Sequence, residues 1–222
     1  MLESSPRSKD VDQEKEDLIV SGTQEAVSLH GGIDDEYEYQ KMKKITEAVR
    51  NLEKAVIMGV SSGNTIGSAS ALRTMAGIRA MITTNVRSVG PSLTESWLGT
   101  ALQDAWSAGG TDIDFILAGV AYKRIIDSFN STRKLISNTD QRFSNVVSQY
   151  ESTFGMMTIM LSRYMPDSEA LVLASKRIKV VPLQKRSFRA VDVLSQGDSR
   201  KGMVLGEYTV ELRNQEGLAR IT

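Results

Sequence analysis

The sequence predicts a mixed α+β protein in which one long amphipathic helix is followed by shorter helices and a strand-rich final third. Three observations lead to this fold class. Apolar residues recur at helical spacing between residues 36 and 58, strand-like runs fill the part after residue 141, and strands and helices do not alternate regularly along the chain. The third observation excludes a doubly wound parallel sheet.

Composition predicts a globular protein with a sizeable core. The chain has 222 residues, of which 41% are hydrophobic, enough for one large domain or two small ones. It has no cysteine and a single histidine, His30, which excludes disulfides, thiol catalysis and the usual ligand sets for zinc and copper. Its apolar runs fall short of the roughly 20 residues of a membrane span, and its charged start is unlike a signal peptide. We therefore expect an intracellular protein with no metal, cofactor or membrane partner.

Opposite charges gather at the two ends of the sequence. Residues 1–58 hold 8 Lys+Arg against 13 Asp+Glu, residues 120–222 hold 16 against 10, and the whole chain has a net charge of zero. Two interpretations stay open: the charges coat a solvated surface, or the acidic front of one copy meets the basic back of another. The second predicts salt-sensitive association between copies. The dispersed cations predict only weak binding to DNA.

The first third is predicted to contain an arm and a long helix. Residues 1–18 are charged and poor in large apolar groups, which predicts a mobile arm. The run "LIVSGTQEAVSLHGG" predicts a short strand and a helical turn that ends at Gly31 and Gly32. A helix from Glu36 to Met58 follows, roughly 34 Å long at about 1.5 Å per residue, with Asp34 or Asp35 as its cap and Gly59 after its end.

This helix carries a single apolar stripe. Five residues at spacings of three and four form it: Met42, Ile45, Val49, Leu52 and Val56. We expect the stripe to pack against a sheet, with roughly 1.5–3 kcal/mol from burying each large side chain. On that interpretation, Val49→Asp would place an unpaired charge in the core and prevent folding.

The middle section predicts two helices and a strand. "PSLTESWLGTALQDAWSAGG" is apolar at helical spacing, with Pro91 and Ser92 before it and a Gly-Gly pair at its end. "DFILAG" is a short buried-type strand, and "AYKRIIDSFNS" is a helix with Ile125, Ile126 and Phe129 inward. The final third holds strand-like runs that we expect to pair antiparallel: "RFSNVVSQY", "GMMTIMLSRYM", "EALVLAS", "IKVVPL" and "MVLGEYTVELRN".

Several short motifs resemble catalytic or ligand sites. "GVSSG" matches the G-x-S-x-G nucleophile elbow at Ser61, but the serine follows a helix and the chain's one histidine, His30, lies upstream. "GNTIGS" lacks the lysine of a phosphate-binding loop. Asp112 and Asp114 form a D-x-D that precedes a strand, which favours turn chemistry over a cation site. We expect His30 in a turn or on the surface.

Two further segments carry no catalytic group. The methionines of the final third predict a soft core or interface cluster: Met156, Met157, Met160 and Met165. "RTMAGIRAMITTN", residues 73–85, joins two arginines to a run of small residues around Gly77. We expect the small residues to allow close backbone packing at a junction, and Arg73, Arg79 and the polar "TTN" to remain free for hydrogen bonds to neighbours.

Taken together, six stretches resemble the major head (capsid) proteins of tailed bacteriophages, in the family typified by phage SU10. They are "VSGTQEAV" at 20–27, "DEYEYQKMKKITEAVRNLEKAVIMG" at 35–59, "RTMAGIRAMITTN" at 73–85, "LTESWLGTALQDAWSAGGTDIDFILAG" at 93–119, "FGMMTIMLSRYMP" at 154–166 and "GEYTVELRNQEG" at 206–217. The resemblance implies the HK97-type capsid fold, with a spine helix, a peripheral domain, an axial domain, an extended loop and an N-terminal arm.

Carried onto this chain, the resemblance implies four segments. Residues 1–34 would be the arm and a remnant of the extended loop, shorter than in the family, and 35–85 the spine helix and junction of the peripheral domain. Residues 86–140 would supply axial-domain helices and a strand, and 141–222 strands shared by both domains.

The resemblance also implies a structural function without catalytic, cofactor or metal residues. Copies would form hexamers and pentamers of an icosahedral shell around phage double-stranded DNA, assembled in the cytoplasm of the host bacterium and carried in the virion. Scaffolding, portal and decoration proteins would be partners, and DNA would be enclosed without sequence-specific binding. Two alternatives stay open: a non-viral nanocompartment shell of the same fold, and a serine hydrolase at Ser61.

We predict that Ser61→Ala and His30→Ala leave the protein's function intact, because neither residue is placed for chemistry. The measurement is labelling by a serine-directed fluorophosphonate, for which we expect no reaction with the unmodified protein. Labelling that disappears in the Ser61 variant would establish the hydrolase alternative instead.

Overall fold

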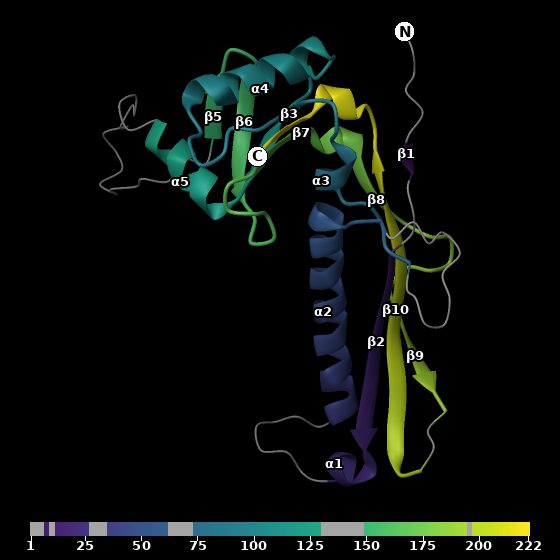
Figure 1. Cartoon of the computed structure of the whole chain (residues 1–222). Helices are drawn as coiled ribbons and strands as arrows, with labels where there is room; N and C mark the ends of the chain where they lie inside the picture. Colours follow the sequence, from purple (N-terminus) through teal and green to yellow (C-terminus); the bar gives the residue numbers. More distant parts are fainter. Residues whose placement is uncertain (1–6, 9–11, 27–34, 62–72, 130–148, 195–196) are drawn as a thin grey trace, which may run out of the picture. The chain divides into compact units, whose positions relative to one another are not determined.

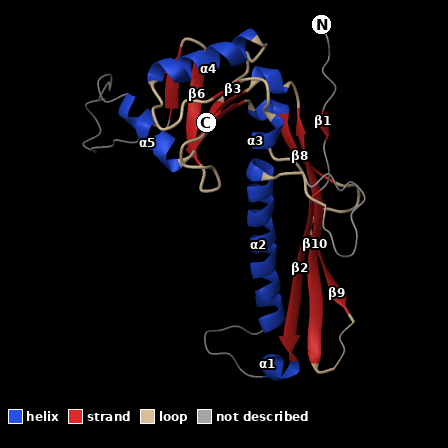
Figure 2. Ribbon diagram, viewed as in Figure 1, coloured by secondary structure: helices blue, strands red, loops and turns tan. Residues whose placement is uncertain are grey.

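The computed structural model describes residues 7–8, 12–26, 35–61, 73–129, 149–194 and 197–222. The chain divides into two compact units. Unit 1 consists mainly of Ile78–Lys179 and Glu211–Thr222, and unit 2 consists of Ser8–Gly77 and Val180–Val210. Each unit combines helices with a sheet, as Figures 1 and 2 show, so the predicted α+β class is confirmed.

Unit 2 is built around one long antiparallel strand pair. β2 (Asp12–Ser21) pairs with β10 (Ser199–Leu212) from Ser21↔Ser199 to Asp12↔Tyr208. On the other side of β10, β9 (Arg189–Val193) pairs antiparallel with Lys201–Leu205. β1 (Arg7–Ser8) and β8 (Ile178–Pro182) also pair with β10. The helix α2 (Glu36–Met58) runs along β2, and the short helix α1 (Gly22–Ala26) follows that strand (Figure 1).

The bounds and caps of α2 confirm the predicted long helix. The Asp35 carboxylate accepts hydrogen bonds from the backbone N–H of Tyr37 at 2.9 Å and of Glu38 at 3.2 Å. These bonds satisfy two donors that have no partner inside the helix. At the other end, the N–H of Gly59 donates to the carbonyl of Ala55 at 2.8 Å.

The prediction that the apolar stripe of α2 is its core face was wrong. Met42 is 65% exposed and Val49 50% exposed, whereas Tyr37, Ala48 and Ile57 are buried. The helix meets β2 with a neighbouring face, where small Ala48 allows close approach and Lys44 bonds to Glu16 of β2 at 3.0 Å. The stripe therefore flanks the contact with β2 and remains half open.

The prediction that residues 1–18 form a mobile arm was wrong from Asp12 onward, where β2 begins. The segment is charged because only one side of the strand is covered. Leu18 and Val20 are buried in a cluster with Tyr37 of α2, while Ile19 between them is exposed. This alternation is that of a strand with one face in the core.

Unit 1 contains a six-stranded sheet in the order β3, β11, β7, β4, β6, β5. These strands are β3 (Val86–Arg87), β4 (Phe115–Ala118), β5 (Gln149–Ser152), β6 (Gly155–Leu161), β7 (Ala170–Leu173) and β11 (Ala219–Ile221). The expected antiparallel pairing is only partly correct. β4 pairs parallel with β6, and β11 pairs parallel with β3, because helices separate the partners along the chain.

Two helices of unit 1 lie near their predicted positions, whereas a short helix at residues 78–81, inside the predicted junction, was not expected. The helices are α3 (Ile78–Met81), α4 (Glu95–Ser107) and α5 (Val120–Phe129), with 3-10 turns at Ser175–Arg177 and Gln215–Gly217. α4 begins later than expected, because the hydroxyl of Thr94, not Ser92, caps it by accepting from Trp97 N–H. Its buried face packs with Ile116 of β4 and Ile126 of α5 in one core.

We predict that Val49→Asp changes the free energy of unfolding by less than about 1 kcal/mol, because the side chain is half exposed. Ala48→Asp, one position along the same helix, should cost about 3 kcal/mol or more because Ala48 is 1% exposed. Urea unfolding followed by circular dichroism measures both. Equal destabilisation by the two variants would show that the stripe is a core face after all.

Candidate functional site

The segment of residues 73–85 holds a buried ion pair in each unit. In unit 2, Arg73 Nη2 lies 3.4 Å from Glu207 Oε2, and Arg186 Nη1 lies 3.1 Å from Glu207 Oε1. Glu207 is only 4% exposed, so its charge needs these partners. The backbone holds Arg186 in place, because the N–H of Glu207 donates to the carbonyl of Arg186 at 2.9 Å.

In unit 1, Arg79 grips a second buried carboxylate with two parallel hydrogen bonds. Its Nε donates to Glu169 Oε2 at 2.6 Å and its Nη2 to Oε1 at 2.5 Å. Arg220 of β11 adds a contact of 3.4 Å to the same carboxylate and donates to the carbonyl of Arg79 at 3.2 Å. This is the fork geometry in which guanidinium–carboxylate pairs are strongest.

The cluster around Glu169 shifts three pKa values. Burial by itself opposes ionisation of Glu169, which is 8% exposed, but hydrogen bonds from Arg79 and the charge of Arg220 outweigh it and lower the carboxyl pKa. The bond to Glu169 raises the pKa of Arg79. Burial and the nearby negative charge of Glu169 raise the pKa of Tyr122, whose hydroxyl donates to the carbonyl of Gly90 at 2.5 Å. All three groups are therefore held in fixed charge states at neutral pH.

Between the two arginines, Gly77 confirms the predicted close packing of backbones. Its N–H donates to the carbonyl of Gly59 at 2.8 Å. A Cβ at Gly77 would lie 2.5 Å from Gly59 N, and one at Gly59 would lie 2.6 Å from Met75 O. Two glycines are thus needed where the chain passes the end of α2.

The polar groups of this segment are not left free, contrary to the prediction. Besides the arginines, the N–H groups of Thr83 and Thr84 donate to Gln215 Oε1 at 3.0 and 3.3 Å. The amide of Asn85 donates to the carbonyls of Glu216 and Leu218. The hydrogen bonds and ion pairs of residues 73–85 join this segment to other parts of the same unit. The role of its polar groups in this chain is therefore structural.

The backbone around Ser61 differs from that of a nucleophile elbow. The residues before it are the end of α2, where a nucleophile elbow needs a strand. His30 and the remainder of "SGNTIGS" after Ser61 lie outside the described residues. The two aspartates of the D-x-D bond within the chain: Asp112 pairs with Arg177, and Asp114 accepts from the N–H of Ser175 at 2.8 Å. These partners lie 65 and 61 positions further along the chain, so the aspartates join distant segments and do not make the local turn that the sequence favoured.

The methionines divide between core and surface. Met157 and Met165 are buried, while Met156 and Met160 are exposed on the other face of β6. Within the described ranges, no group of three or more His, Cys, Asp or Glu side chains is placed to hold a metal ion. In that part of the chain, no helix is both long and apolar enough to cross a bilayer.

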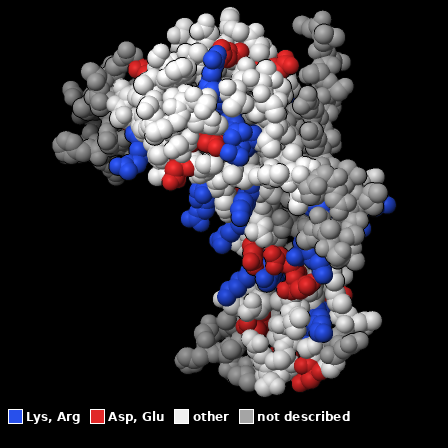
Figure 3. Space-filling view, in the orientation of Figure 1, with Lys and Arg blue, Asp and Glu red and all other residues white. Residues whose placement is uncertain are grey.

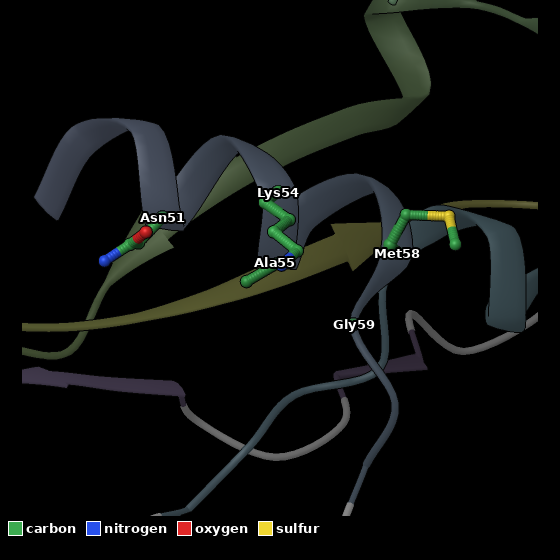
Figure 4. A pocket seen from close by; sticks show the side chains of 5 residues that line it. All are labelled: Asn51, Lys54, Ala55, Met58 and Gly59. Atoms are coloured by element: carbon green, nitrogen blue, oxygen red, sulfur yellow. The ribbon is translucent and has the colours of Figure 1, made fainter. Parts of the chain in front are cut away.

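A hollow of about 280 Å³ lies at the C-terminal end of α2 in unit 2 (Figure 4). Its lining is Asn51, Lys54, Ala55, Met58 and Gly59. Lys54 is the ionisable group among these five lining residues, so they bring together no acid–base pair.

Some acidic residues of the first part of the sequence form ion pairs with basic residues of the last part within the same chain. Arg200 lies 3.4 Å from Glu25 and 3.7 Å from Asp35, and its guanidinium stacks 3.9 Å from the centre of the Tyr37 ring. Figure 3 shows acidic and basic side chains mixed on the visible face of the described surface. The front-to-back attraction proposed between copies is therefore partly satisfied in the chain itself.

Three buried groups were missed by sequence reasoning: Tyr37, Glu169 and Glu207. Tyr37 donates to Asp192 at 2.5 Å, and burial with this hydrogen bond to an anion raises its pKa to about 12. A signal existed for Glu169, since it directly precedes the apolar run "ALVLA". The arginine partners lie 90 and 51 positions away in sequence, which no local pattern reveals.

The sequence matches the family described as SU10 major capsid protein over residues 14–222. A comparison with curated proteins finds no match.

Solved shell proteins share the fold. The capsid protein of cyanophage A-1(L) has a TM-score of 0.70 at 9% identity, over 95% of this chain and 76% of that one. The holo-SrpI encapsulin complex from Synechococcus elongatus gives 0.63 at 11% identity, over 99% and 82%. A structure of Mycobacterium phage Adephagia gives 0.56 at 12% identity, over 96% and 71%. The chain therefore has the HK97-type fold that the sequence predicted.

We predict that Glu169→Gln lowers the free energy of unfolding by about 2–3 kcal/mol at neutral pH, because it leaves two arginines without their anion. Since the native pKa of Glu169 is lowered, its stabilisation is complete above the ordinary glutamate pKa and is lost as pH falls through the native value. The variant's stability should vary less over that acidic range. The control is Glu38→Gln, which breaks the exposed pair with Lys41 and should cost less than about 1 kcal/mol. Equal losses would contradict the cluster's role.

Proposed function

This chain belongs to the SU10 major capsid protein family, and from that premise we propose that its copies form hexamers and pentamers of an icosahedral head that encloses double-stranded phage DNA. As a capsid protein, it is a structural component of the virion. The observation that carries the proposal is the family match over residues 14–222, which includes residues of both units. Family membership also supports assembly in the host cytoplasm and partnership with scaffolding, portal and decoration proteins.

We propose the domain roles from the fold. Unit 2, with α2 as the spine helix, would be the peripheral domain, and unit 1 would be the axial domain. The long helix beside a two-stranded ribbon in unit 2, and the compact six-stranded sheet of unit 1, support this assignment.

The open apolar surface supports assembly. Met42 and Val49 on α2 and Met156 and Met160 on β6 are exposed in the single chain. Contacts between copies would remove such groups from water and gain about 25 cal/mol per Å² of apolar area. We also propose that the protein is not an enzyme, in keeping with its structural family and with the surroundings of Ser61 described above.

A nanocompartment shell is the second candidate, and the likeness to the SrpI encapsulin favours it. The two functions differ in contents, because a head holds nucleic acid and a nanocompartment holds protein cargo. The ratio of absorbance at 260 and 280 nm of purified particles, before and after nuclease treatment, distinguishes them.

We predict that the full chain forms rings or closed shells at micromolar concentration, visible in electron micrographs and as species far above 24.4 kDa in mass photometry. If exposed ion pairs contribute between copies, raising salt from about 0.1 to about 1 M should weaken early association, because the Debye length falls to ~3 Å. Val49→Asp should retain the fold and reduce assembly. A protein that remains monomeric under all assembly conditions would contradict the proposal.

A further inference from the structure

Three cations on α2 have no anionic partner among the residues that the structure describes. Lys43, Arg50 and Lys54 are exposed, and within the described part of the chain none of them forms an ion pair. The other two lysines of the helix are neutralised: Lys41 pairs with Glu38 at 2.9 Å, and Lys44 with Glu16 and Glu47. The helix therefore separates its cations into a paired set and an unpaired set.

The unpaired set occupies one face of the helix, which we name the basic stripe. At 100° per residue, Lys43, Arg50 and Lys54 point within about 40° of one another. They span roughly 16 Å along the axis at 1.5 Å per residue. Lys43 Nζ lies 4.1 Å from the centre of the Tyr39 ring, which orients the ammonium without cancelling its charge.

The acidic groups nearby do not cancel the basic stripe. Glu47 lies about 40° from Lys43 and about 20° from Lys54 around the helix, and it shares the one cation of Lys44 with Glu16, so it offsets part of the stripe's charge but is outnumbered by the three cations. Glu53 points about 100° away from Lys54 and about 60° away from Arg50, and it forms no ion pair with either within the described residues. The stripe also differs from the apolar stripe of α2, which lies on another face of the same helix.

We propose that the basic stripe is a contact site for the phosphate backbone of double-stranded DNA, which makes this face of α2 the side of the wall that meets the packaged DNA. This inference rests on the proposed function. One DNA strand carries a phosphate every 3.4 Å along the axis, so the stripe spans about five phosphates. The side chains end in flexible amines and a guanidinium, which bind phosphate oxygens without reading base sequence.

The expected interaction is weak and strongly dependent on salt. Neutralising three phosphates gives a slope of log K against log salt of about −2.7, or roughly a 40-fold loss of affinity between 50 and 200 mM salt. Many copies in a wall would hold the DNA through the sum of such contacts, while no single subunit binds it tightly.

The test measures binding of the full chain to a 30-base-pair duplex across 50–200 mM salt. The variant is Lys43→Gln, Arg50→Gln and Lys54→Gln together; glutamine keeps the helix, which circular dichroism verifies. The matched control removes three exposed cations elsewhere: Lys176→Gln, Lys185→Gln and Arg189→Gln. We expect the first variant to lose most of the salt dependence and the control to retain it.

Two results would overturn the inference. One is a slope that stays at the unmodified value in the stripe variant, or falls equally in both variants, which means that binding is diffuse. The other is unchanged duplex binding together with fewer particles, which means that the cations contact an acidic segment of another copy. Failure of the proposed function is seen separately, as the absence of closed particles from the unmodified protein in electron micrographs.

Discussion

Unit 2 depends on the antiparallel pairing of β2 with β10. Ten residues near the start of the chain pair with ten near its end, and α2 and β9 pack or pair with the two strands of this ladder. It brings Arg200 to Glu25 and Asp35, and it sets Leu18 and Val20 beneath Tyr37 of α2. Such pairing is costly to initiate because a long loop must close before any contact forms.

The segment of residues 73–85 gives each unit one buried ion pair of the same design. Arg73 meets Glu207 in unit 2, and Arg79 meets Glu169 in unit 1, in each case with a second arginine on the carboxylate. Buried pairs add little net stability over apolar residues, but losing one partner is expensive. Each arginine of the segment is therefore tied to the unit that contains its carboxylate, and removing either partner would leave a buried charge without a counter-ion.

The surface of the single chain is consistent with a shell subunit. The helix α2 has three different faces. One carries the half-exposed apolar stripe, a second carries cations without an ion pair among the described residues, and a third is buried against β2. Individually weak contacts of this kind suit a closed assembly, because their number, not their strength, holds the wall. Ser61 follows the end of α2 and not a strand, so the local backbone is unlike that of a nucleophile elbow.

The sequence by itself determined the class of fold, the ends of α2, the helices α4 and α5, the strands β4, β6 and β7, and the family, because these follow from local periodicity, caps and ordered motifs. The close backbone packing at Gly77 could also be predicted, because a run of small residues allows two backbones to approach each other. Tertiary structure alone decided which face of α2 is buried, that Asp12–Ser21 is a strand, and that Arg79 belongs to Glu169. The apolar stripe of α2 predicts that one face of the helix is buried. Which face is buried depends on where β2 packs, and β2 contacts the face beside the stripe. Likewise, a charged strand looks like an arm until its partner, nearly two hundred residues away, pairs with it.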